Sequence, residues 1–95
     1  MKTFADARFS IRRRPAGIMG KIYLGNDIRI SIIMHEYSYG GTQGLWEIAC
    51  FGKKGQVDLE CLDHDVVGYL TFTELEQKIK EIQEELNNNN SNNNK

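Results

Sequence analysis

Apolar and polar residues alternate from Phe9 to Leu62, a pattern typical of half-buried β-strands. The first strand carries Phe9 and Ile11 on one side, and Pro15-Ala16-Gly17 turns the chain into the second. A three-residue loop, Gly25-Asn26-Asp27, is expected to join the second and third strands in a hairpin. The register that brings their aliphatic side chains onto one face pairs Leu24 with Ile28, Ile22 with Ile30 and Ile18 with Met34.

A second hairpin is predicted around the turn Gly52-Lys53-Lys54-Gly55. Its apolar residues select one register, in which Cys50 faces Val57, Ile48 faces Leu59 and Trp46 faces Cys61. This register separates the two cysteines by about 13 Å along the ladder, too far for a disulfide, so we expect free thiols. On the opposite side Glu47 would face Glu60 and Asp58 would face Ala49, which predicts an acidic, solvated strand face.

The clearest helix signal follows residue 70. Thr71 and Glu74 have the spacing of a capping box, which places the start of a helix there. An apolar stripe at 3, 4, 3, 4 spacing then comprises Phe72, Leu75, Ile79, Ile82 and Leu86. The last nine residues, 87–95, are seven asparagines, one serine and one lysine, which bury no apolar area and are expected to form a disordered tail.

These elements predict an α+β fold: an antiparallel β-meander of about five strands with one C-terminal α-helix packed on one face. The helix should cover the face that holds Ile22, Ile30, Ile48 and Leu59. Residues 1–86 would then form a single domain, because 95 residues allow one small core. An internal cavity of substrate size would be costly in a core of this size.

Charge is unevenly distributed along the chain, although the net charge is only -1. Residues 1–35 carry seven Lys or Arg against two Asp, a net charge of +5, whereas residues 36–95 carry five Lys against eleven Asp or Glu, a net charge of -6. The chain has no apolar run long enough to span a membrane, and its polar N-terminus is unlike a signal peptide. We therefore expect a cytoplasmic protein without a membrane partner.

The basic residues of the N-terminal half suggest a phosphate-binding sheet face. Alternation weakens this interpretation, because Arg13 should point away from Arg12 and Arg14. Aromatic residues, which a nucleic-acid-binding sheet would use for base stacking, are also not expected at the positions beside these basic residues on the sheet. A solvated edge strand, protected from aggregation by its charge, explains the arginines as well. The candidate nucleic-acid residues are Arg8, Arg12, Arg14, Lys21 and Arg29.

Metal binding and catalysis receive little support. Cys50, Cys61, His35 and His64 lack the paired spacing of zinc ligands, and the two cysteines fall on the apolar face. The chain has no glycine-rich phosphate loop and no nucleophile elbow. We therefore predict no metal, no cofactor and no enzymatic activity.

The segment Glu36 to Gly44 is too long for a tight hairpin and contains two tyrosines and three glycines. Tyrosines on a glycine-rich backbone are typical of recognition loops, because the ring offers a large contact area at a small entropic cost. The alternative is a packed connection in which Tyr37 and Tyr39 close one end of the core and the glycines adopt positive φ. The sequence leaves both readings open.

Three segments, taken in order, resemble a group of small proteins of tailed bacteriophages and prophages. They are Tyr37-Ser38-Tyr39-Gly40-Gly41, Gly44-Leu45-Trp46-Glu47-Ile48-Ala49 and Asp65-Val66-Val67-Gly68-Tyr69-Leu70-Thr71, and the similarity covers residues 9–85. The group has no established activity, so the resemblance carries no functional residues onto this chain. It implies a phage or prophage accessory protein in the cytoplasm of a bacterial host cell.

The function expected from this setting is non-enzymatic: binding and inhibiting or redirecting a host protein, for example in anti-defence, by an acidic face that mimics nucleic acid. The first alternative is a small nucleic-acid-binding module built on the N-terminal arginines. The second is an oligomeric sponge for a small ligand such as a nucleotide, and the oligomeric state stays open, a homodimer included. The candidate partner-binding residues are Tyr37, Tyr39, Gly40, Gly41, Glu47, Asp58 and Glu60.

Overall fold

The computed structural model describes residues 1–93, with a six-stranded sheet and one long helix. The strands are β1 (Arg8–Arg13), β2 (Ala16–Gly25), β3 (Ile28–His35), β4 (Trp46–Gly52), β5 (Gly55–Gln56) and β6 (Val67–Leu70). The helix is α1 (Phe72–Asn93), and three short 3₁₀ helices are η1 (Phe4–Asp6), η2 (Gly41–Gln43) and η3 (Glu60–Leu62).

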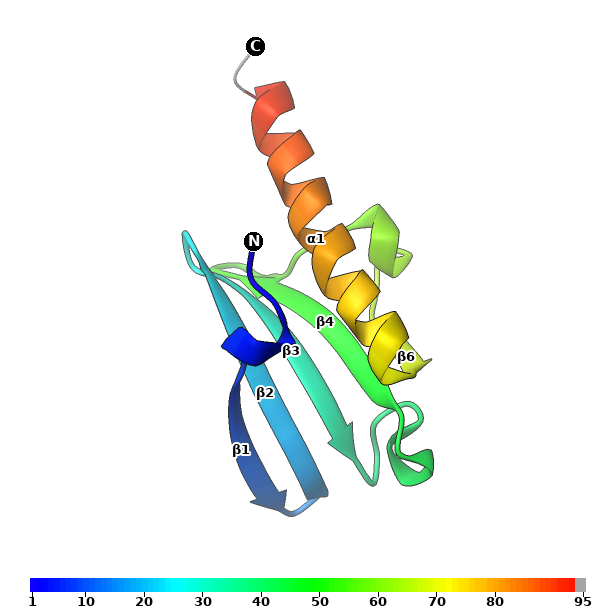
Figure 1. The fold of residues 1–95 in the computed structure, drawn as a ribbon. Helices are drawn as coiled ribbons and strands as arrows, with labels where there is room; N and C mark the ends of the chain where they lie inside the picture. Colours follow the sequence, from blue (N-terminus) through cyan, green and yellow to red (C-terminus); the bar gives the residue numbers. More distant parts are fainter. Residues whose placement is uncertain (94–95) are drawn as a thin grey trace.

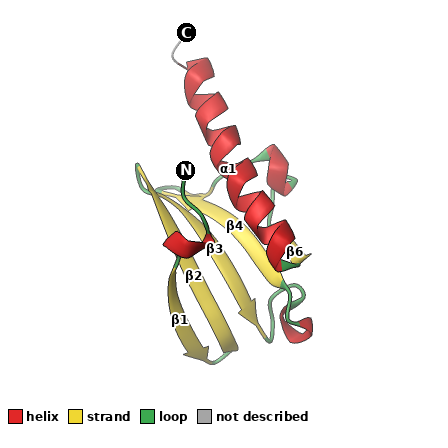
Figure 2. Cartoon of the chain, viewed as in Figure 1, coloured by secondary structure: helices red, strands yellow, loops and turns green. Residues whose placement is uncertain are grey.

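The sheet is antiparallel throughout, in the order β1-β2-β3-β4-β5, with β6 also paired to β4. Helix α1 crosses one face of the sheet diagonally, and its C-terminal part extends past the sheet (Figure 1). The result is a two-layer arrangement, with the helix on one side and the strands on the other (Figure 2). This architecture confirms the predicted α+β fold with a meander of five strands and a C-terminal helix.

The first long hairpin, β2–β3, has the predicted register through most of its length. Ile22 lies opposite Ile30, and Ile18 lies opposite Met34. The turn is one residue shorter than predicted, because Gly25 pairs with Ile28 and a β-bulge follows Tyr23, so the predicted pairing of Leu24 with Ile28 was wrong. Asn26 and Asp27 adopt φ angles of 53° and 64°, as the tightest hairpin turns require, and both residue types tolerate this conformation.

The second hairpin forms only at its tip. Phe51 pairs with Gln56 and Gly52 with Gly55, and the Val57 amide donates to the Cys50 carbonyl at 2.9 Å, as the predicted register requires. Beyond Gln56 the ladder ends, and β6 takes the place beside β4, with Trp46 opposite Leu70 and Ile48 opposite Val67. The predicted pairs Ile48 with Leu59, Trp46 with Cys61, Glu47 with Glu60 and Ala49 with Asp58 were therefore wrong.

The reason for this difference lies in the core. Leu59 and Leu62 are both fully buried, and Leu62 belongs to η3, which packs against α1. A spacing of three residues brings both leucines to the same side of a tight helical turn, which a strand cannot do. The alternation of apolar residues at 57, 59 and 61 therefore does not indicate a strand. Burial of Leu62 favours the 3₁₀ helix η3 in its place.

The hydrophobic core joins the sheet to the helix. Ile22, Ile30, Ile48 and Leu59 are completely buried, as predicted, and they cluster with the helix residues Leu75, Ile79 and Ile82. The two ends of the predicted apolar stripe are less enclosed. Leu86 is partly buried, and Phe72 is 46% exposed, with its ring edge-on to Phe4 at 4.9 Å between centroids.

The helix begins where the capping box predicts. The Thr71 amide donates to Glu74 Oε1 at 2.9 Å, and the Glu74 amide donates to Thr71 Oγ1 at 3.2 Å. The hydrogen bond from the Thr71 amide, and after it one from the Thr71 side chain, lowers the pKa of the Glu74 carboxyl below its ordinary value. At the other end α1 continues through Asn93, past Leu86 where the apolar stripe ends. Residues 94–95 of the expected tail lie outside the described part.

Candidate functional site

The sheet face opposite α1 carries the candidate nucleic-acid residues. Directly opposite residues of antiparallel strands point to the same side of the sheet, so the strand register assigns each residue to a face. One row across the sheet runs Arg8, Lys21, Ser31, Ala49, and the neighbouring row runs Tyr23, Arg29, Phe51, Gln56. Two further rows are Ser10, Met19, Ile33, Glu47 and Arg12, Gly17, His35. We call the surface formed by these four rows the open face.

Within residues 1–93 no helix covers the open face. The buried residues of α1 and η3 pack against the other side of the sheet, and Phe4 of η1 lies there too, against Phe9 and Trp46. Four of the five predicted basic residues, Arg8, Arg12, Lys21 and Arg29, therefore lie on one uncovered surface. The fifth, Arg14, lies in the turn between β1 and β2, and Arg13 points to the opposite face, as alternation predicts.

The open face also holds aromatic rings. The guanidinium of Arg8 lies 5.9 Å from the ring centroid of Tyr23, and that of Arg29 lies 5.4 Å from the ring centroid of Phe51, both within cation–π range. The expectation that no aromatic residue neighbours the basic ones was wrong. Tyr23 and Phe51 are distant in sequence, and only the register of β2, β3 and β4 puts them in one row with Arg29.

A shallow hollow of about 410 Å³ runs over the open face, with Lys21, Arg29 and Phe51 among its lining residues. Arg12 lines it as well and donates to the Met19 sulfur at 3.9 Å. Glu47 is the one acidic residue in the four rows of the described chain, and its Oε1 accepts a hydrogen bond of 2.9 Å from the Tyr39 amide. Glu47 also lines the hollow, so the surface carries four cations and one carboxylate, which the Tyr39 amide holds.

The loop from Glu36 to Gly44 exposes its tyrosines. Tyr37 is 80% exposed and Tyr39 is 57% exposed, so the reading in which they close the core is wrong. The loop backbone is nevertheless fixed: the buried Ser38 accepts from the His35 amide and donates to the His35 carbonyl, each at 2.9 Å. The Tyr39 carbonyl also accepts from the Tyr69 amide at 3.0 Å, which places a third exposed tyrosine beside the loop.

The two predicted loop glycines have packing roles. Gly40 is buried with a φ of 88°, and a Cβ there would lie 2.9 Å from the Cα of Tyr69. A Cβ on Gly41 would overlap the carbonyl oxygen of His35 and the hydroxyl of Ser38. Both positions therefore require glycine for the loop to reach its place, which holds whether or not the loop binds a partner.

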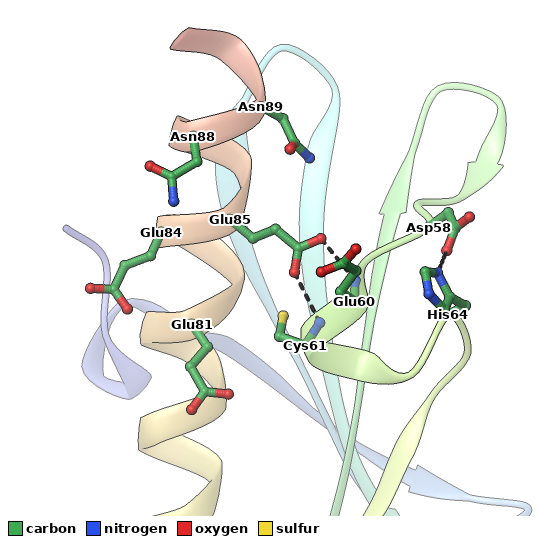
Figure 3. Close-up of a pocket in the computed structure, with 9 residues that line it drawn as sticks. All are labelled: Asp58, Glu60, Cys61, His64, Glu81, Glu84, Glu85, Asn88 and Asn89. Carbon is green, nitrogen blue, oxygen red and sulfur yellow. Dashed lines mark hydrogen bonds and ion pairs between the residues drawn. The ribbon is translucent and has the colours of Figure 1, made fainter. Parts of the chain in front are cut away.

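The predicted acidic strand face does not form. Glu47 lies on the open face, whereas Asp58 follows the end of the β4–β5 ladder and Glu60 belongs to η3. A different acidic surface appears instead between η3 and α1, lined by Asp58, Glu60, Glu81, Glu84 and Glu85 (Figure 3). The sequence contains one part of this surface, the three glutamates at 81, 84 and 85 of the helix. Only the contact between η3 and α1 brings Asp58 and Glu60 close to them.

The acidic surface is tied together by local hydrogen bonds. Glu85 accepts from the Glu60 amide at 2.8 Å and from the Cys61 amide at 2.9 Å (Figure 3). Lys78 donates to the Cys61 carbonyl at 2.8 Å and to Glu81 at 3.0 Å. The imidazole of His64 pairs with Asp58, and this hydrogen bond and charge raise the pKa of His64. These contacts give the cluster a structural role in fastening η3 to α1.

Both cysteines are free, as predicted. Burial raises the pKa of Cys50 to about 11. The pKa of Cys61 is raised to about 12, mainly by burial and to a smaller extent by a hydrogen bond to Glu85. Neither cysteine is therefore activated as a thiolate near neutral pH. In the part of the chain that the structure describes, no group of three or more His, Cys, Asp or Glu residues is arranged to hold a metal ion.

The double hydrogen bond of Glu85 supports a prediction about pH. Partial burial raises the pKa of Glu85, but the amides of Cys61 and Glu60 outweigh it and hold the pKa below 4.5. A carboxyl whose pKa is lowered by folding stabilises the fold above its unfolded-state pKa and loses this contribution as the pH falls through its folded-state pKa. Glu85→Gln should therefore cost about 1 kcal/mol at pH 7, since one strong acceptor is lost at a partly exposed site.

This cost should disappear as the pH falls below about 4.5, because protonation then removes the same charge from the unsubstituted protein. Urea unfolding of both proteins at a series of pH values measures the difference. Glu84→Gln makes the same charge change on a neighbouring exposed residue and should leave stability unchanged within about 0.5 kcal/mol. A pH-independent deficit in Glu85→Gln would contradict the assignment.

The fold and the geometry define a class: a small two-layer α+β protein whose antiparallel sheet keeps one face uncovered, basic and partly aromatic. Comparisons with protein-family models, with curated proteins and with solved structures found no match. Within residues 1–93, no helix has the length and apolar character needed to cross a membrane.

Proposed function

We propose that the open face binds single-stranded nucleic acid. The observation that carries this proposal is the gathering of Arg8, Arg12, Lys21 and Arg29 with two aromatic rings on one sheet face that no helix of residues 1–93 covers. The resemblance to phage proteins is compatible with such a role but does not specify it.

The chemistry of the face matches both parts of a nucleotide. Cations neutralise phosphates, and this term supplies most of the affinity of sequence-independent binding. Exposed rings on a sheet provide stacking platforms for bases. Tyr23 is 51% exposed, and Phe51 lines the hollow, so each ring can be approached from solvent. Bases in a duplex are already stacked on each other, so rings of this kind favour a single strand.

Arg8 and Arg29 are placed where each can contact either an aromatic ring of the protein or a phosphate of a bound strand. In the free protein Arg8 and Arg29 lie over Tyr23 and Phe51 respectively. When a base takes the place above the ring, each guanidinium is free to pair with the adjacent phosphate, where a planar cation binds two oxygens at once. The Tyr39 amide, by binding Glu47, lessens the repulsion that this carboxylate would exert on the backbone of a bound strand.

Salt-dependent binding of a 15-nucleotide fluorescein-labelled oligothymidylate, followed by anisotropy, tests the proposal. With four phosphates neutralised, the slope of log K against log salt should be about -2.8, since each contact to a single strand contributes about -0.7. Affinity that does not change between about 50 and about 200 mM salt would rule the proposal out.

The aromatic part of the proposal has its own test. Tyr23→Ala should weaken binding about tenfold with the salt slope unchanged, because a stacking platform is removed and no cation is lost. Tyr37→Ala is the matched control, since Tyr37 is more exposed than Tyr23 and lies in the loop after β3, outside the four rows. Equal losses in both variants would contradict stacking on the open face.

A second candidate function has a separate observation in its favour: three tyrosines, Tyr37, Tyr39 and Tyr69, are exposed around one fixed loop. We propose that this surface binds a host protein. Capture of a bacterial protein that survives nuclease treatment, and that is lost in the double variant Tyr37→Ala and Tyr39→Ala, would support it. Retention of the captured protein by that double variant would refute it.

A further inference from the structure

The outer side of β1 is an unpaired sheet edge in the part of the chain that the structure describes. β1 is the first strand in the sheet order and pairs only with β2, and all six of its residues are exposed. Figure 1 shows β1 as the outermost strand, on the side of the sheet away from α1. Alternate amides and carbonyls of such a strand point outward with no partner, which is the arrangement that accepts an added strand.

The side chains of β1 differ between its two faces. On the helix side, Ile11 is 88% exposed and Phe9 is 43% exposed, because α1 lies over the other edge of the sheet. On the open face, Arg8 and Arg12 are exposed cations. An added strand would therefore meet apolar side chains on one face and positive charge on the other.

We propose that the β1 edge binds an extended acidic peptide of another protein by strand addition. The side chains opposite Arg12, Ile11, Ser10, Phe9 and Arg8 define the peptide pattern: Asp or Glu, apolar, any residue, apolar, Asp or Glu. The pattern reads the same in both directions, so it holds for a parallel and an antiparallel peptide. Opposite charges and apolar pairs directly across a ladder each stabilise it, and backbone hydrogen bonds supply the rest.

A second copy of the chain does not fit this edge. Antiparallel pairing of two β1 strands about Ser10 would place Arg8 of each copy opposite Arg12 of the other, and like charges across a ladder repel. The acidic pattern defined above also occurs nowhere in this sequence. The partner is therefore a different chain, and its recognition does not depend on Tyr23 or Phe51 of the open face.

The probe is a fluorescein-labelled peptide with the central segment Glu-Val-Thr-Val-Glu between flexible Gly-Ser ends, and binding is followed by anisotropy. A peptide with the central segment Lys-Val-Thr-Val-Lys should bind at least about tenfold more weakly, because two cross-strand ion pairs become repulsive. Equal affinities for the two peptides would overturn the proposal.

Backbone pairing is tested with two N-methylated peptides. One is methylated on the odd-numbered nitrogens of the central segment and the other on the even-numbered ones; we call these the two phases. One edge of the added strand faces β1 and the other faces solvent, so one phase should abolish binding and the other should be tolerated. If both phases bind like the unmodified peptide, contact is through side-chain charge alone and strand addition is wrong.

Protein variants separate this edge from the proposed nucleic-acid surface. Ile11→Ser should weaken peptide binding about fivefold without loss of stability, because the side chain is exposed in the free protein. Tyr23→Ala should bind the peptide normally, even where it loses the oligonucleotide. Unchanged peptide affinity in Ile11→Ser would overturn the proposal, and so would a dimer in sedimentation that Ile11→Ser dissociates, since a second copy would then occupy the edge.

Discussion

Replacing both Lys21 and Arg29 by Glu is expected to weaken single-stranded oligonucleotide binding about 100-fold at 100 mM salt. The two residues lie in adjacent rows of the open face and line the same hollow. At this salt concentration each lost phosphate contact costs about fivefold, and the new carboxylates add repulsion. Anisotropy with the labelled oligothymidylate measures the change, with thermal unfolding to verify that the variant is folded.

The matched control exchanges Arg13 and Lys80 for Glu. It makes the same change in net charge, but Arg13 points to the helix side of the sheet and Lys80 is exposed on α1. This control should keep its affinity within about threefold, since neither side chain lies on the open face and neither would contact a phosphate bound there. Comparable losses in the two double variants would mean that binding follows net charge and that the open face has no special role.

A neutral pair, Lys21→Gln with Arg29→Gln, makes the test quantitative and avoids carboxylates on the sheet. Removal of two phosphate contacts should reduce the salt slope by about 1.4. A slope that stays at the unsubstituted value would show that Lys21 and Arg29 do not contact phosphate.

Gly41→Ala is expected to lower the free energy of unfolding by about 3 kcal/mol, or the Tm by roughly 15 °C. The added methyl group would overlap the carbonyl oxygen of His35 and the hydroxyl of Ser38. Neither can withdraw easily, because these groups bond each other and the Gly41 amide donates to the Ser38 carbonyl at 3.1 Å. Thermal and urea unfolding measure the loss.

Gly44→Ala is the control within the same loop. Gly44 has a positive φ of 74°, which Gly41 does not have, but a Cβ on Gly44 would have no atom within 4 Å. Its replacement should therefore cost only the backbone strain of about 1 kcal/mol. If Gly41→Ala is as stable as Gly44→Ala, the loop is not packed as the structure has it, and loss of partner capture in Gly41→Ala would then report on binding rather than folding.

The first hairpin and the helix start were predictable because their signals are local. Ile22 and Ile30 are paired by a hairpin whose turn has only two residues. Thr71 and Glu74 cap the helix through hydrogen bonds within its first turn. The second hairpin was predictable only at its tip for the same reason. Beyond Gln56 the alternation of residues 57–61 was ambiguous, and the burial of Leu62 under α1 overrode it.

The sequence alone determined which residues lie on which side of strands β1 to β4, and therefore that Arg8 and Arg12 share one side of β1. Tertiary structure decided that their face stays uncovered in residues 1–93, that Tyr23 and Phe51 lie in one row there, and that β1 keeps a free edge. The physical reason is distance along the chain. Side-chain alternation acts between neighbouring residues, whereas strand order and the position of α1 result from burying the whole core at once.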